Sequence, residues 1–228
     1  MSNIKTNLCF GCMRPIELNR SRCPLCGYDN AQQNNLKDVL LEETVLNGKY
    51  LVGKMLGRGG FGITYLGFDL NLRIRITIRE YFPVGMSIRV PCSYDVLPLA
   101  DRESAAAFEK GFSVFLNEEK NLSIYGCPYI VHVRDVFKEH GTVYIIMDYI
   151  EGTALSETVA GMGEKMPVEQ VLSLMKPLIQ QLAALHCQKI IHRGIMPRNI
   201  VIVKEAESGE EKLVLVDFSS ACPFNKHY

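Results

Sequence analysis

Four cysteines near the N-terminus have the spacing of metal ligands. Cys9 and Cys12 form one Cys-x2-Cys pair, Cys23 and Cys26 form a second, and ten residues separate the pairs. A Cys-x2-Cys turn directs two thiolates and several backbone N–H groups toward one ion, and two such turns complete a tetrahedral site. Residues 1–28 are therefore predicted to form a zinc ribbon.

Four protein ligands leave no open position on the ion, so the zinc is expected to be structural rather than catalytic. Disulfides and an iron site of the rubredoxin type are the alternatives. About 25 residues cannot bury enough surface to fold alone, so the metal must supply the folding free energy. A polar linker is predicted at residues 29–47, and we expect a Cys23→Ser change to unfold the ribbon alone. Nucleic-acid binding is not expected, because no basic and aromatic patch accompanies the cysteines.

A second group of residues with chemical potential is the glycine cluster Gly57, Gly59, Gly60 and Gly62. The Gly-x-Gly-x-x-Gly spacing is weak evidence by itself, because dinucleotide-binding turns share it. Here strand-like alternation lies on both sides, and no helix begins at the last glycine, as a dinucleotide fold would require. A glycine hairpin between antiparallel strands can lay backbone amides over phosphates. A merely flexible hairpin is the alternative.

Hydropathy periodicity predicts the elements that must position these residues. A first strand runs from residue 50 into the glycines, and helices are predicted at residues 105–124 and 168–188, with Pro177 inside the second. Further strands are predicted at residues 64–68, 74–78, 131–137, 142–147, 200–204 and 212–216. This mixture of separate strands and helices is an α+β pattern.

Composition excludes several functional classes. The chain has 228 residues and a formal net charge of zero, so no global field attracts nucleic acid or an anionic membrane. The first twelve residues lack the apolar core of a signal peptide, and the longest apolar run, residues 143–147, is too short to cross a bilayer. A cytoplasmic location is expected. The remaining cysteines, Cys92, Cys127, Cys187 and Cys222, are scattered like ordinary buried thiols.

Three further segments resemble protein kinase motifs. Residues 191–199 read Ile-His-Arg-Gly-Ile-Met-Pro-Arg-Asn, residues 76–83 read Ile-Thr-Ile-Arg-Glu-Tyr-Phe-Pro, and residues 217–219 read Asp-Phe-Ser. With the glycine cluster, they make residues 48–228 similar to the eukaryotic-like Ser/Thr protein kinases of bacteria, including a kind that carries an N-terminal zinc ribbon. The resemblance implies a protein kinase-like fold with a complete N-lobe (48–147) and a partial C-lobe (152–228), truncated after the Asp-Phe-Gly-like motif.

The resemblance also implies a site for ATP and magnesium, with the phosphates under the glycine hairpin and the adenine at a hinge. The positions that match the family's nucleotide-binding residues are Gly57, Gly59, Gly60, Gly62, Thr64, Arg79, Glu118, Met147, Asp148, Ile150, Asn199 and Asp217. Asn199 and Asp217 match magnesium ligands. Glu118 matches the helix glutamate that pairs with the strand cation, and Glu119 is a near alternative.

Three catalytic positions depart from the family pattern. Gly194 stands where kinases have the Asp that accepts the substrate proton, and Met196 stands where they have a Lys near the transferred phosphate. Arg79 replaces the strand Lys, and its planar fork is bulkier than an ammonium group. The departures favour a pseudokinase with a binding or regulatory role and little or no phosphotransfer. A weak or atypical Ser/Thr kinase and a nucleotide-free interaction module or remnant are the alternatives.

The helix predicted at residues 168–188 is apolar on more than one face, because Leu174 and Ala183 widen the stripe of Leu178, Leu182 and Leu185. A helix that is apolar nearly all round is normally buried on all sides. In the kinases that the chain resembles, helices beyond the equivalent of residue 228 cover this surface. We therefore expect self-association or a protein partner on this face of the C-lobe.

Overall fold

The computed structural model describes residues 7–17, 20–32, 36–91, 93–122, 131–163, 165–205, 208–218 and 221–224, without the side chains of residues 117–122 and 222–223. The chain divides into two compact units. Unit 1 contains Met1–Glu119 and Val133–Tyr149, and unit 2 contains Lys120–His132 and Ile150–Tyr228. Among the described residues, no helix combines the length and the hydropathy that a membrane span needs.

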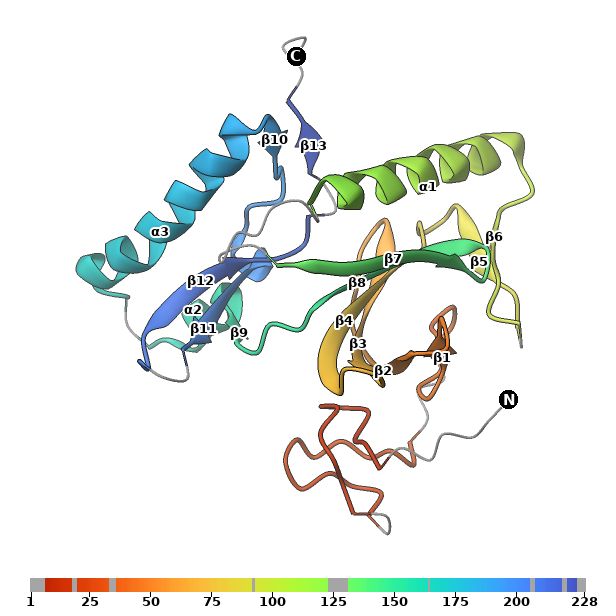
Figure 1. The fold of residues 1–228 in the computed structure, drawn as a ribbon, viewed down its shortest axis with the longest axis horizontal. Helices are drawn as coiled ribbons and strands as arrows, with labels where there is room; N and C mark the ends of the chain where they lie inside the picture. Colours follow the sequence, from red (N-terminus) through yellow and green to blue (C-terminus); the bar gives the residue numbers. More distant parts are fainter. Residues whose placement is uncertain are drawn as a thin grey trace. The chain divides into compact units, whose positions relative to one another are not determined.

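A curled antiparallel sheet of six strands forms the centre of unit 1 (Figure 1). The strand order is β1-β2-β3-β4-β8-β7. The strands are β1 (Val45–Leu46), β2 (Tyr50–Arg58), β3 (Gly62–Asp69), β4 (Ile74–Tyr81), β7 (Val133–Glu139) and β8 (Thr142–Asp148). Their richness in Val, Ile and Tyr suits a pleated, half-buried surface, and the predicted strands in this part of the chain are confirmed with small shifts at their ends.

Strand β4 presents different chemistry on its two faces, because successive side chains of a strand point to opposite sides. On one face Tyr81 packs against the rings of Phe108 and Phe115 of helix α1 (Arg102–Leu122). Arg79 lies on the same face, with its guanidinium 5.0 Å from the centroid of the Phe115 ring. The opposite face carries Ile76, Ile78 and Glu80, all fully buried.

The cysteine-rich segment packs directly on the sheet. Its side chains Leu8, Phe10 and Met13 form one buried cluster with Leu51 and Leu66 of the sheet. A Cβ atom at Gly53 would lie 2.3 Å from the Met13 Cε and 2.7 Å from the Phe10 carbonyl oxygen, so only glycine permits this approach. The ribbon and the sheet share a core. The expectation that a Cys23→Ser change would unfold the ribbon alone assumed that the two are separate, and that assumption was wrong.

Residues 36–44, here called the strap, run along unit 1 without a helix. Leu40 of the strap is 1% exposed, and its backbone N–H donates to the Tyr65 hydroxyl at 3.2 Å. The hairpin of β5 (Ser87–Arg89) and β6 (Val96–Pro98) follows β4. The proposed boundary of the linker at residues 29–47 stays a prediction.

Unit 2 contains a three-stranded antiparallel sheet in the order β12-β11-β9. Helix α3 (Val168–Cys187) packs on β12 and buries Leu174, Leu178 and Leu185, with Pro177 inside the helix as predicted. The elements are β9 (Thr153–Ala154), α2 (Leu155–Gly161), β10 (Ile190–Ile191), a 3-10 turn (Pro197–Asn199), β11 (Ile200–Lys204), β12 (Glu211–Leu215) and β13 (Cys222–Pro223), with β10 and β13 paired.

Candidate functional site

The four N-terminal cysteines converge on one point. Their Sγ atoms all lie within 4.8 Å of one another. The sulfurs of Cys9 and Cys26 are 3.5 Å apart, and those of Cys12 and Cys23 are 3.8 Å apart. Zn–S bonds of about 2.3 Å in a tetrahedron place the sulfurs about 3.8 Å apart. The residues therefore fit a zinc ion, and all four are free thiols.

The local backbone favours an ionised sulfur at one of these positions. Burial opposes the thiolate of Cys23, but the backbone N–H groups of Cys26 and Leu25 outweigh it and lower the pKa of Cys23 to about 7. Burial raises the pKa of Cys9 and of Cys12. Because zinc binds thiolates, an ion at this site would displace protons from these two sulfurs.

The glycine cluster forms a tight hairpin between β2 and β3. Gly57 pairs with Thr64, and the Gly59 N–H donates to the Gly62 carbonyl at 2.9 Å. A Cβ at Gly62 would lie 2.4 Å from the Glu80 carbonyl, so packing against β4 requires this glycine. A Cβ at Gly57 or Gly60 would meet nothing within 4 Å. Packing does not explain those two glycines, and bare backbone at these positions would admit the close approach of a ligand.

Arg79 lies in β4, the strand that pairs with the second strand of the hairpin. Its side chain is 6% exposed, and in the sheet register it lies opposite Thr64 of β3. The backbone of Glu118 belongs to α1, as predicted, but its side chain lies outside the described part of the chain. The predicted pairing of Glu118 with Arg79 therefore stays a prediction.

The predicted hinge follows the last long strand of unit 1. Met147 is buried in β8, and Asp148 ends that strand instead of following it. The carboxylate of Asp148 forms an ion pair with Arg134 of β7. The predicted contacts of this segment with adenine would fall to its backbone groups and stay a prediction. Ile150 begins the second segment of unit 2.

The loop after β10 holds the degenerate catalytic positions of unit 2. The Asn199 side chain is buried, and its Nδ2 donates to the Gly194 carbonyl at 2.8 Å. The Gly194 N–H donates to Nδ1 of His192, which is fully buried, and burial lowers the pKa of this imidazole. Met196 precedes the 3-10 turn, and its carbonyl accepts from the Asn199 N–H. The loop is ordered without a carboxylate at position 194.

Asp217 lies beside this loop. Its φ of 61° is in the left-handed region, which aspartate tolerates better than most residues. The backbone N–H of Val216, the preceding residue, donates to the Asn199 carbonyl at 2.9 Å. The ring of Phe218 packs edge-on against that of His192, with 4.4 Å between the ring centroids. Ser219 lies outside the described residues.

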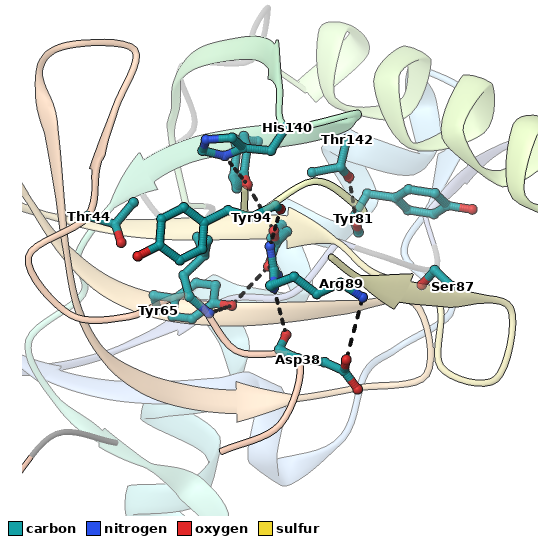
Figure 2. Close-up of polar contacts among 12 residues, drawn as sticks. Asp38, Thr44, Tyr65, Tyr81, Ser87, Arg89, Tyr94, His140 and Thr142 are labelled. Carbon is teal, nitrogen blue, oxygen red and sulfur yellow. Dashed lines mark hydrogen bonds and ion pairs between the residues drawn. The ribbon is translucent and has the colours of Figure 1, made fainter. Parts of the chain in front are cut away.

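The predicted residues therefore fall into two groups, one in each unit. The sequence interpretation missed a third set in unit 1, made by Asp38, Glu80 and Arg89. Figure 2 shows Asp38 and Arg89 of this set. Two signals could have found it. Glu80 is a charge in an otherwise apolar strand face, and such a buried charge needs a partner. Asp38 precedes the apolar pair Val39 and Leu40 within a polar segment.

Comparison with known proteins agrees with this arrangement. The profile of the protein kinase domain matches residues 100–228, more than half of the chain. The chain is 29% identical to the serine/threonine-protein kinase pkn2 of Myxococcus xanthus over 79% of its length, and 27% identical to PrkC of Bacillus subtilis over 69%. It is 25% identical to PknG of Mycolicibacterium smegmatis over 96% of its length.

The matches cover 19%, 21% and 26% of these three relatives, so the chain spans about a fifth to a quarter of their length. Among solved structures, the chain described as PpkA-294 apo form superposes with a TM-score of 0.70 and 28% identity. That match covers 80% of this chain and 62% of the other. The glycine hairpin, the sheet of unit 1 and the loop around Asn199 are thus parts of one known fold, and the chain belongs to the protein kinase family, with bacterial eukaryotic-like Ser/Thr kinases among its relatives.

Proposed function

We propose that the chain is a pseudokinase: it binds ATP with magnesium weakly, transfers little or no phosphate, and carries one structural zinc ion. The relatives are named as serine/threonine-protein kinases, which supports a site for nucleotide. The four convergent cysteine sulfurs support the zinc. A binding or regulatory role follows, because a fold that holds nucleotide without chemistry can act through its conformation.

One observation carries the proposal more than any other. The Asn199 side chain is anchored on the Gly194 carbonyl through Nδ2, an orientation that leaves Oδ1 as the ligand atom for a metal. The same hydrogen bond fixes a residue that has no side chain to accept a proton. The loop therefore keeps a candidate magnesium ligand in place while it lacks the general base of a kinase.

ATP is expected to bind the full chain more tightly with magnesium than without it. Asn199→Ala and Asp217→Ala should each remove most of the magnesium effect, because each deletes a candidate oxygen ligand, and leave binding of the metal-free nucleotide within about twofold. Titration of a fluorescent ATP analogue against each variant, with magnesium or with a chelator, measures this directly.

The matched control is Asp95→Ala, which removes an aspartate of unit 1 that lies outside all proposed nucleotide-binding positions. It should bind like the parent chain. Equal affinities with and without magnesium in the parent would mean that Asn199 and Asp217 do not serve as ligands, and the nucleotide-free module would then be the better description.

The second part of the proposal concerns helix α3. Its side chains Val168, Leu172 and Ile179 are 66%, 62% and 56% exposed and follow one another at helical spacing. We propose that this stripe binds a protein partner or a second copy of the chain. A second copy is the form that can be tested with the chain alone.

The chain is therefore expected to form a concentration-dependent dimer in sedimentation velocity experiments. Leu172→Glu and Ile179→Glu should each weaken the dimer at least about tenfold, because each buries an unpaired charge in the contact. Val159→Glu, in the exposed part of α2, is the matched control and should leave association unchanged. A parent chain that stays monomeric up to high concentration would contradict self-association.

A further inference from the structure

The tip of the glycine hairpin is held by the residues that follow β4. The Phe82 N–H donates to the Phe61 carbonyl at 3.1 Å, and the Val84 N–H donates to the Gly60 carbonyl at 2.9 Å. These bonds continue the pairing of β3 with β4 beyond Tyr81 and into the hairpin. The position of the hairpin therefore depends on what fixes the segment around Phe82.

Arg58, at the start of the hairpin, turns back toward the strap. Its Nη2 lies 3.7 Å from Asp38 Oδ2, and its Nη1 donates to the Lys37 carbonyl at 3.4 Å. The Arg58 guanidinium also lies 5.2 Å from the centroid of the Phe82 ring, within the range of a cation–π contact. One arginine thus joins the hairpin, the strap and Phe82.

Asp38 joins this arginine to another. Its Oδ1 accepts from the Arg89 backbone N–H at 3.5 Å, and its carbonyl accepts from Arg89 Nε at 3.1 Å, as the dashed lines between the two residues in Figure 2 show. The φ of Asp38 is 64°, a left-handed conformation that aspartate and asparagine tolerate better than most residues. The Arg89 guanidinium lies 5.3 Å from the Phe82 ring, so Phe82 contacts both arginines.

Arg89 is itself immobilised by the buried Glu80. Its Nη2 donates to Glu80 Oε2 at 2.6 Å, and the hydroxyls of Tyr65 and Tyr144 each donate to the same carboxylate at 2.9 Å. Glu80 is 0% exposed and the Arg89 side chain is 6% exposed. Burial and the charge of Glu80 hold the pKa of Tyr65 well above its usual range, so its hydroxyl stays a donor. A buried carboxylate with three donors, one of them a paired cation, holds its neighbours rigidly in place.

We propose that Asp38 is a positioning residue for the nucleotide site: through Arg58 and Arg89 the strap fixes the glycine hairpin at a set distance from β4. The inference rests on the nucleotide binding proposed above. It assigns a role to residues that lie outside the hairpin, the hinge and the loop of unit 2. Release of Asp38 would let the hairpin move away from the phosphates while the fold of the sheet persists.

The test replaces the charge and keeps the shape. Asp38→Asn retains the left-handed turn and the carbonyl acceptor but loses the ion pair, and Arg58→Met retains the apolar stem of the side chain. Each should speed amide hydrogen exchange at Gly59, Phe82 and Val84, and nucleotide dissociation, by about two- to fivefold, the range of a half-exposed ion pair. Because the two changes break the same contact, the double variant should add little. Asp38→Glu keeps the negative charge and should show exchange and dissociation rates close to those of the parent chain.

Glu43→Gln is the matched control, since Glu43 is an exposed acidic residue of the same strap, also with a left-handed φ of 71°, and forms no part of the Asp38 contacts. It should behave like the parent. Unchanged exchange and dissociation in Asp38→Asn would overturn the inference. Faster exchange with no nucleotide binding by the parent chain would instead overturn the proposed function and its link to the strap, while the hold of the strap on the hairpin would stand.

Discussion

No phosphate transfer above background is expected when the full chain is incubated with radiolabelled ATP, magnesium and a mixture of serine- and threonine-containing proteins. The missing carboxylate at Gly194 alone should remove about 10²–10⁴-fold of rate, the usual contribution of a general base. Arg79 and Met196 should weaken phosphate positioning further, although effects within one site do not multiply. The measurement is incorporated label per hour, compared with a sample without protein.

Asp217→Ala is the control that identifies the source of any signal. Label incorporated by the parent and lost in this variant would contradict the account and restore the weak or atypical kinase. Label that persists in the variant would point to a contaminant. Gly194→Asp should fold, because a Cβ at this position meets His192 at 3.3 Å and Asn199 at 3.4 Å, contacts that shifts of a few tenths of an ångström relieve. It should gain little activity while Arg79 and Met196 remain.

Removal of the metal is expected to destabilise all of unit 1, not the ribbon alone. One zinc per chain should be found by elemental analysis, and Cys9→Ser or a strong chelator should lower the thermal midpoint by about 10 °C or more. The reason is the shared cluster: truncation of a buried aromatic such as Phe10 typically costs about 3–5 kcal/mol, and an unfolded ribbon also withdraws Leu8 and Met13.

Hydrogen exchange locates the effect of metal removal within the chain. Strands β2 and β3 should lose protection together with the ribbon, because Leu51 and Leu66 lose their cover. Leu25→Ala is the matched control, since Leu25 lies in the ribbon between two ligands but is 61% exposed. It should leave the midpoint within about 1 °C. A chelated chain that keeps its midpoint, or a sample that contains iron, would contradict the zinc ribbon.

Most of the fold could be predicted because its signals are local. The alternation through Ile74, Ile76 and Ile78 identified β4, and the apolar periodicity of residues 168–188 identified α3 to within one residue. The cysteine spacing likewise predicted that four ligands converge, because each Cys-x2-Cys turn is a local structure. Candidate residues such as Asn199 and Asp217 were found through the family resemblance, and periodicity alone could not have identified them.

The long-range contacts could not be predicted in the same way. Glu80 and Arg89 are nine residues apart, and no pattern shows that the chain folds back to pair them under Tyr65 and Tyr144. The strap was predicted to be a polar linker, because the sequence does not show which surface its few apolar residues cover. The docking of the ribbon depends on Gly53, whose missing side chain admits Met13. Such complementarity exists only in three dimensions.

One measurement tests the central claim most directly: isothermal titration of the full chain with ATP and magnesium, followed by chromatography of the recovered nucleotide after several hours. We expect saturable, magnesium-dependent binding and ATP that is recovered intact, which is the signature of a kinase fold that binds without transfer. Conversion of ATP to ADP, lost in Asp217→Ala, would contradict the absence of chemistry. A titration without saturation would contradict nucleotide binding.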